Sequence, residues 1–142
     1  MSPRRGAGED GFTAAELALG LGLLLFPVAM LVLTLPTWSE RQTTARAIAH
    51  EVAREVAREG VCDTAAATGL GTIMARNLGL PAGDATVALD CAAGEPLPRG
   101  GSVESAVTVA IPAVHLPGFG DVAAWSWTAR HREPVDQYGS IP

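Results

Sequence analysis

The sequence predicts an α+β protein in which one long N-terminal helix packs on a small antiparallel sheet. Three observations predict this class. An uncharged apolar run covers residues 17–36, an amphipathic helical pattern follows it, and short strand patterns occur toward the C-terminus. At 142 residues, the chain has room for about one small domain.

The apolar run 17–36 is long enough to cross a membrane as a helix. Its 20 residues carry no charge, and at about 1.5 Å per residue they extend roughly 30 Å, the thickness of a bilayer's hydrocarbon core. The buried helix of a soluble domain is rarely apolar on every face over such a length. Pro27 is expected to kink the helix without ending it. No small-x-small cleavage site follows the run, so an uncleaved anchor fits better than a secretory signal.

The helix is predicted to continue past the apolar run through residues 37–60. Small and β-branched side chains recur there at helical spacing and form one apolar stripe: Ala45, Ile48, Ala49, Val52, Ala53 and Val56. Glutamates and arginines occupy the opposite side as i,i+3 pairs. Gly60 is typical of a residue that ends a helix. We therefore expect one nearly continuous helix of about 45 residues, half of it in lipid.

A second, shorter helix is predicted next. Asp63 is a candidate N-cap for it. The larger apolar side chains of this helix share a face at helical spacing: Leu70, Ile73, Met74 and Leu78.

Three strand patterns then predict a small antiparallel sheet over residues 86–91, 102–111 and 122–132. The second strand places four apolar side chains on one face: Val103, Val107, Val109 and Ile111. The third places Trp125, Trp127 and Ala129 on one side. The Gly- and Pro-rich stretches between the strands, and the tail, are predicted to be loops: 92–101, 112–121 and 132–142.

The two cysteines, Cys62 and Cys91, both lie beyond the apolar run. An even pair indicates a disulfide formed in an oxidising compartment; two unpaired buried thiols are the alternative. Arginines lie on both sides of the apolar run, so the positive-inside rule does not orient it. The cysteine pair favours a short cytoplasmic tail with the bulk of the chain outside.

Composition and motifs argue against several classes of function. Beyond Pro36, 12 acidic residues stand against 8 arginines, so the basic footprint of a nucleic-acid-binding protein is absent. The histidines (His50, His115 and His131) are scattered, and no His or Cys cluster has the spacing of metal ligands. Neither a GxSxG motif nor a phosphate-binding glycine loop occurs. We therefore predict no enzymatic activity, no cofactor and no metal site.

Gly11-Phe12 followed by Glu16 resembles the processing site of type IV pilin-like proteins, in which glycine precedes the cut and glutamate is the fifth mature residue. More specifically, the chain resembles the TadE-like minor pilins of the tight-adherence (Flp, type IVb) pilus system. The similar parts are the arginine-bearing leader, GFTAAELAL, ARAIAHEVAREVAREG and WTARHREPVDQYGS. The resemblance covers most of the chain, and its N-terminal third is the specific part. Leu17 departs from it, because many such segments have an aromatic residue after the glutamate.

The resemblance implies a pilin-like fold in four segments: a cytoplasmic leader (1–11), a transmembrane and assembly helix (12–36), an amphipathic extension (37–60) and an extracytoplasmic head (61–142). It implies cleavage by a prepilin peptidase between Gly11 and Phe12. We expect Glu16 to pair with the new amine and to act in assembly; the alternative is that Glu16 is a polar boundary residue of an ordinary signal anchor. The protein would be a single-pass bacterial membrane protein whose partners are the bilayer, other pilins and the inner-membrane assembly platform. An unprocessed single-pass envelope protein with a binding head stays open as the alternative.

Overall fold

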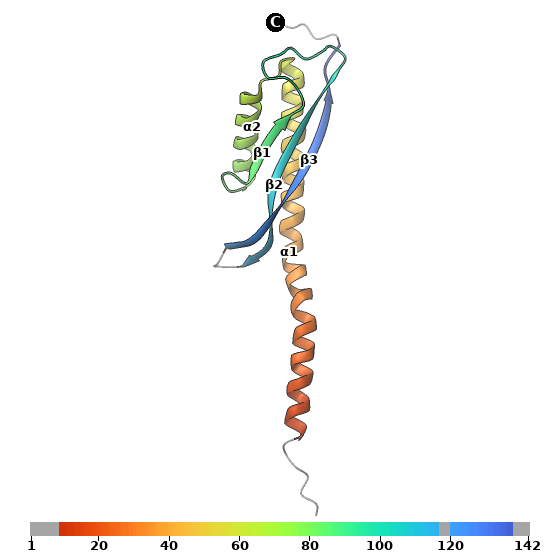
Figure 1. The fold of residues 1–142 in the computed structure, drawn as a ribbon, viewed down its shortest axis with the longest axis vertical. Helices are drawn as coiled ribbons and strands as arrows, with labels where there is room; N and C mark the ends of the chain where they lie inside the picture. Colours follow the sequence, from red (N-terminus) through yellow and green to blue (C-terminus); the bar gives the residue numbers. More distant parts are fainter. Residues whose placement is uncertain (1–8, 117–119, 138–142) are drawn as a thin grey trace, which may run out of the picture. The chain divides into compact units, whose positions relative to one another are not determined.

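The computed structural model describes the backbone of residues 9–116 and 120–137, and the side chains of residues 13–113 and 125–137. Its elements are α1 (Glu9–Glu59), α2 (Thr64–Asn77), β1 (Ala85–Leu89), β2 (Ser102–Leu116) and β3 (Gly120–Pro134) (Figure 1). The chain divides into an N-terminal unit, Met1–Pro36, and a C-terminal unit, Thr37–Pro142. Helix α1 runs through both. A long N-terminal helix that packs on a small antiparallel sheet confirms the predicted α+β class.

Helix α1 is continuous and contains both Pro27 and Pro36. In the C-terminal unit its predicted apolar stripe is buried throughout: Ala45, Ile48, Ala49, Val52, Ala53 and Val56. Gly60 adopts a φ of +71°, which suits glycine, and its N–H donates to the carbonyl of Val56 at 3.1 Å. The continuous helix, its buried stripe and its end are therefore as predicted.

The three strands form an antiparallel sheet in the order β1-β2-β3. In the register of the sheet, Val107 on β2 pairs with both Val87 on β1 and Ala129 on β3. Alternate β2 side chains that face α1 are fully buried: Val103, Ser105, Val107, Val109 and Ile111. Helix α2 packs on the same side, over β1 (Figure 1). The C-terminal unit therefore has two layers, and its other sheet face is uncovered within the described residues.

Strands β2 and β3 extend further than the sequence predicts. The stretch 112–121 was expected to be a loop, and this expectation is wrong, because β2 continues to Leu116 and β3 begins at Gly120. The Pro112 carbonyl accepts from Trp38 Nε1 at 2.7 Å. Pro112 is tolerated because β1 begins only at Ala85, opposite Val109, so the missing N–H of Pro112 interrupts no ladder with β1. The loop predicted over 132–142 also begins later in the sequence than expected, because β3 runs to Pro134.

The buried face of α2 consists of small residues. Ala67, Gly71 and Ala75 are buried, while Ile73 and Leu78 of the predicted face are 50% and 46% exposed. The predicted apolar face is therefore wrong for these two residues; Leu70 and Met74 are partly buried against the core. Small side chains let α2 approach β1 and α1 closely, because a Cβ at Gly71 would overlap Cγ2 of Val87 and lie 3.6 Å from Ile48.

We expect Gly71→Ala to lower the free energy of unfolding by about 1–3 kcal/mol, because the added methyl group overpacks the contact with Val87. Gly69→Ala is the matched control on the same helix, since nothing lies within 4 Å of a Cβ at Gly69. It should be neutral or stabilising by roughly 0.5–1 kcal/mol, since alanine is the better helix former. Thermal unfolding followed by circular dichroism compares the two; equal effects would contradict this packing.

Polar contacts fix α1 to the sheet within the C-terminal unit. Ser105 Oγ, fully buried on β2, donates to the carbonyl of Ala49 at 2.6 Å. Arg41 forms an ion pair with Asp84 and donates to the carbonyl of Ala110 at 3.1 Å. These bonds set both the height and the rotation of α1 on β2, which places the side chains described below.

Candidate functional site

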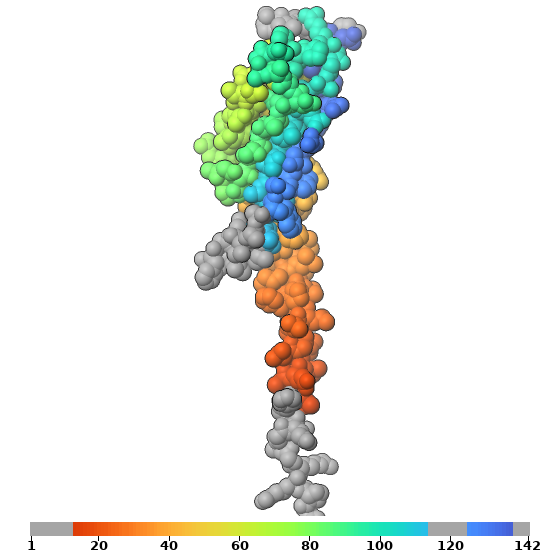
Figure 2. Space-filling view, in the orientation of Figure 1, coloured from red at the N-terminus to blue at the C-terminus, as the bar shows by residue number. Residues whose placement is uncertain are grey.

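The N-terminal part of α1 presents an apolar surface on all sides. Its leucines, phenylalanine and valines from position 17 to 35 are roughly half exposed or more: Leu17, Leu19, Leu21, Leu23, Leu24, Leu25, Phe26, Val28, Leu31, Val32, Leu33 and Leu35. Figure 2 shows this stretch in red to orange, with side chains standing out along the helix. The segment is long and apolar enough to cross a membrane. An apolar surface of this extent is typical of a helix that contacts lipid or other helices.

Glu16 lies at the start of this apolar surface. It shares one face of α1 with residues at helical spacing: Thr13, Leu17, Gly20, Leu21 and Leu24. In the described part of the chain, no ion pair or hydrogen bond is formed by the Glu16 carboxylate, and no atom lies within 4 Å of a Cβ at Gly20. Because Gly20 has no side chain, a second helix can pack closely beside the Glu16 carboxylate and supply a positive group.

The predicted cleavage site lies at the edge of what the structure describes. The backbone of Gly11 and Phe12 is helical and belongs to α1. The side chain of Phe12 and the leader residues 1–8 lie outside the described residues. On α1, Phe12 is four positions before Glu16, so the two residues are neighbours on one helical face.

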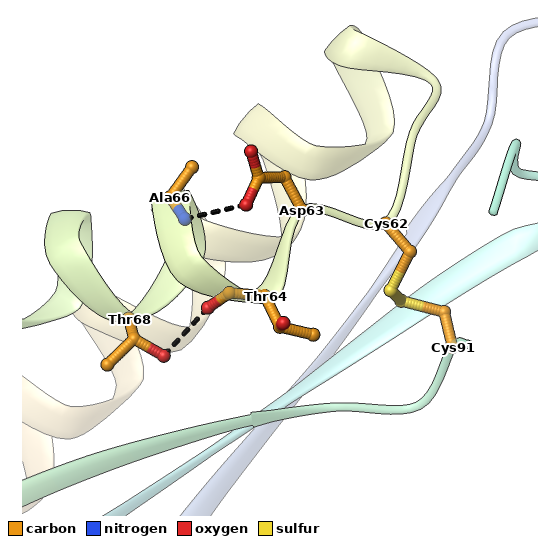
Figure 3. Close-up of a disulfide and its surroundings, with 6 residues drawn as sticks. All are labelled: Cys62, Asp63, Thr64, Ala66, Thr68 and Cys91. Atoms are coloured by element: carbon orange, nitrogen blue, oxygen red, sulfur yellow. Dashed lines mark hydrogen bonds between the residues drawn. A yellow bond between two sulfur atoms is a disulfide. The ribbon is translucent and has the colours of Figure 1, made fainter. Parts of the chain in front are cut away.

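The predicted disulfide between Cys62 and Cys91 is present (Figure 3). It joins the α1–α2 connection to the segment that follows β1, with the Cα atoms 6.0 Å apart. Backbone hydrogen bonds tie the same two segments together: Cys62 N–H donates to the Glu95 carbonyl at 2.9 Å, and Gly94 N–H to the Cys62 carbonyl at 2.8 Å. Next to it, Asp63 caps α2 by accepting from the N–H of Ala66 at 2.8 Å, as predicted.

The uncovered sheet face carries an ion-pair cluster of Glu104 on β2 with Arg130 and Arg132 on β3. Each arginine donates to one carboxylate oxygen of Glu104 at 3.0 Å. The hydrogen bond from Arg130, then that from Arg132, lowers the pKa of Glu104 below its usual value. Because the pKa of Glu104 is lowered in the folded state, its ion pairs stabilise the fold at pH values above the ordinary carboxyl pKa. This stabilisation is lost as the pH falls through the lowered pKa. These ion pairs link β2 to β3, and the cluster presents no reactive group.

The structure brings together two of the three histidines that are scattered in the sequence. His50 on α1 and His131 on β3 meet edge to face, with their ring centroids 4.6 Å apart and their planes at 63°, and His131 Nε2 lies 3.0 Å from a Glu133 oxygen. Sequence reasoning did not find this pair, because the two residues lie on different elements whose register is fixed only by the fold. The alternation of β3 does place Glu133 on the same face as His131.

Tryptophans gather where the C-terminal unit begins. Trp38 contacts Trp125 with the ring centroids 4.9 Å apart and the planes tilted by 55°, and Arg46 lies over the ring of Trp127 at 5.2 Å. Trp38 and Trp127 are partly buried against the core, whereas Trp125 is 47% exposed. These rings pack α1 against β3.

No family model matches the chain, and neither a curated protein nor a solved structure matches it.

Proposed function

We propose that this chain is a minor pilin or pseudopilin, TadE-like, of a tight-adherence (Flp, type IVb) pilus. A prepilin peptidase cuts it between Gly11 and Phe12, and the mature subunit assembles with other pilins through its apolar N-terminal helix. The observation that carries this proposal is Glu16: an unpaired carboxylate, among the described residues, at the entrance of an exposed apolar helix. It lies one helical turn after the proposed new N-terminus.

Cleavage changes which environment the N-terminus can enter. Before the cut, the leader adds four charged side chains ahead of the apolar helix: Arg4, Arg5, Glu9 and Asp10. Moving such charges into a bundle of apolar helices carries a heavy desolvation penalty. After the cut, the helix begins with Phe12 and a single α-amino group. Proteolysis therefore converts an anchored precursor into a subunit that can leave the bilayer and pack with others.

The new amine also gives Glu16 a partner. Phe12 and Glu16 are i and i+4 on α1, so an ammonium at residue 12 and the carboxylate can pair within one subunit or between neighbours. A carboxylate at mid-bilayer costs up to about 3 kcal/mol, and less at the membrane edge. The helix N-terminus itself favours a negative side chain. Pairing offsets the remaining cost and sets how far one helix slides along the next.

The C-terminal unit supports the same proposal. It is a small α+β head carried on the continuation of the assembly helix, and a disulfide closes it. Disulfides persist in oxidising compartments, so we place this head outside the bacterial cell membrane and the N-terminus in the cytoplasm. The partners proposed are the prepilin peptidase, the other pilins, the inner-membrane assembly platform and the bilayer.

We expect Gly11→Val to block cleavage, because a side chain at the residue before the cut hinders close approach of the backbone to the peptidase. The uncut protein should stay in the membrane fraction and be absent from sheared surface filaments. Immunoblots of both fractions from cells that carry the pilus system measure this. Gly8→Val, three residues upstream in the same leader, is the matched control and should be cleaved and exported normally.

The alternative, an unprocessed anchor with a binding head, gives a different result. The wild type and Gly11→Val would then show the same length and both would stay in the membrane. That outcome would exclude assembly through a processed N-terminus.

A further inference from the structure

We propose that His50, His131 and Glu133 form a binding site for a divalent transition-metal ion, best matched by Zn²⁺, between α1 and β3. One ligand atom from each residue lies within 4.8 Å of the other two. All three residues belong to the C-terminal unit, so the site is independent of cleavage at the N-terminus.

The backbone positions of the two histidines are fixed by buried contacts next to them. Ser105 on β2 pairs with His131 across the sheet, and its hydroxyl donates to the carbonyl of Ala49, the residue before His50. Ser105 and Ala49 are both 0% exposed. One buried residue therefore connects the strand that carries His131 to the helical turn that carries His50. The helix and the strand hold the backbones of the two histidines in fixed register, which reduces the cost of ordering their side chains around an ion.

The side chains are accessible enough to receive an ion. His50 is 48% exposed, His131 34% and Glu133 29%. Tetrahedral zinc with nitrogen and oxygen ligands at 2.0–2.2 Å brings neighbouring ligand atoms to about 3.3–3.6 Å apart. His131 Nε2 and the Glu133 oxygen are already 3.0 Å apart. Rotation of the exposed His50 ring toward them closes the remaining distance.

The donor set selects the metal. Two imidazoles and one carboxylate are borderline ligands that favour Zn²⁺ and related first-row ions over Ca²⁺ or Mg²⁺. Glu51 lies 3.8 Å from Nδ1 of His50 and can accept a hydrogen bond from that nitrogen when Nε2 binds the ion. Three protein ligands leave one position for water. A bound ion would join α1 to the edge strand β3, at a place where the disulfide makes no link.

Isothermal titration with zinc chloride tests the site, with the full chain in detergent micelles and purified without a histidine tag. We expect one zinc ion per chain in the wild type. His50→Ala and His131→Ala should each weaken binding at least about tenfold, and Glu133→Gln should also weaken it. His115→Ala removes the remaining histidine, on β2, and should bind zinc like the wild type.

Two further measurements distinguish a variant that has lost the metal site from one that has lost its fold. The unfolding temperature without metal should be similar in the wild type and all variants, and zinc should raise it more in the wild type and His115→Ala than in the three ligand variants. Cobalt in place of zinc should give visible absorption bands typical of tetrahedral nitrogen and oxygen ligands, and His131→Ala should lack them. Wild-type zinc affinity in both His50→Ala and His131→Ala, or an equal loss in His115→Ala, would overturn the proposal.

Discussion

Replacing Glu16 by alanine is expected to leave cleavage after Gly11 intact and to reduce the amount of protein in surface filaments by about tenfold or more. The carboxylate lies beyond the cut and does not alter the scissile bond. Its loss removes the charge-assisted pair with the new amine, worth roughly 1.5–3 kcal/mol for a hydrogen bond to a charged group. Since about 1.4 kcal/mol is a factor of ten, incorporation should fall by at least that factor. Quantitative immunoblots of sheared filaments, scaled to the amount of protein in the membrane fraction, measure the incorporation.

Two controls isolate the charge of Glu16. Glu16→Gln keeps the shape without the charge and should behave like Glu16→Ala. Glu40→Ala removes an exposed glutamate from the same helix, in the C-terminal unit, and should assemble like the wild type. Normal incorporation of a correctly cleaved Glu16→Ala chain would show that the carboxylate has no role in assembly.

Loss of the disulfide is expected to have the largest effect on stability. Replacing both Cys62 and Cys91 by alanine opens a loop whose ends are 29 residues apart. In the chain-entropy model, such a loop contributes roughly 3–4 kcal/mol to the free energy of unfolding. For a unit of this size, the melting temperature should fall by roughly 10–20 °C. Thermal unfolding of the wild type and the double variant, followed by circular dichroism, measures the difference.

A reducing agent provides the control for the disulfide. It should lower the melting temperature of the wild type toward that of the double variant and leave the double variant unchanged. The buried Cys62 also packs in the core, so the reduced wild type separates the effect of the cross-link from that of the lost sulfur atoms. Equal melting temperatures under all conditions would contradict a stabilising role for this bond.

The parts of the fold set by local periodicity were predictable from the sequence. The stripe from Ala45 to Val56 repeats at helical spacing and is buried, and Asp63 caps α2. Alternation along β2 identified its inward apolar face, although Ser105 on that same face was not recognised. The hydroxyl of Ser105 interrupts the apolar pattern of β2. The serine is buried there because its hydroxyl donates a hydrogen bond to the Ala49 carbonyl of α1.

The parts set by tertiary contact were not predictable. Helical spacing predicts one face of α2 from its apolar residues, but close approach to Val87 selects Gly71 and its small neighbours as the buried face. Pro112 is predicted to end a strand, but it is tolerated because β1 begins only at Ala85, opposite Val109, and the missing N–H interrupts no ladder with β1. His50 and His131 meet only because α1 and β3 are held in one register by Ser105.

The N-terminal mass of the protein recovered from native membranes and sheared filaments decides whether proteolysis frees an apolar helix and creates an amine beside Glu16. We expect a mature chain that begins at Phe12. A chain that still begins at Met1, and that is absent from every filament fraction, would contradict it.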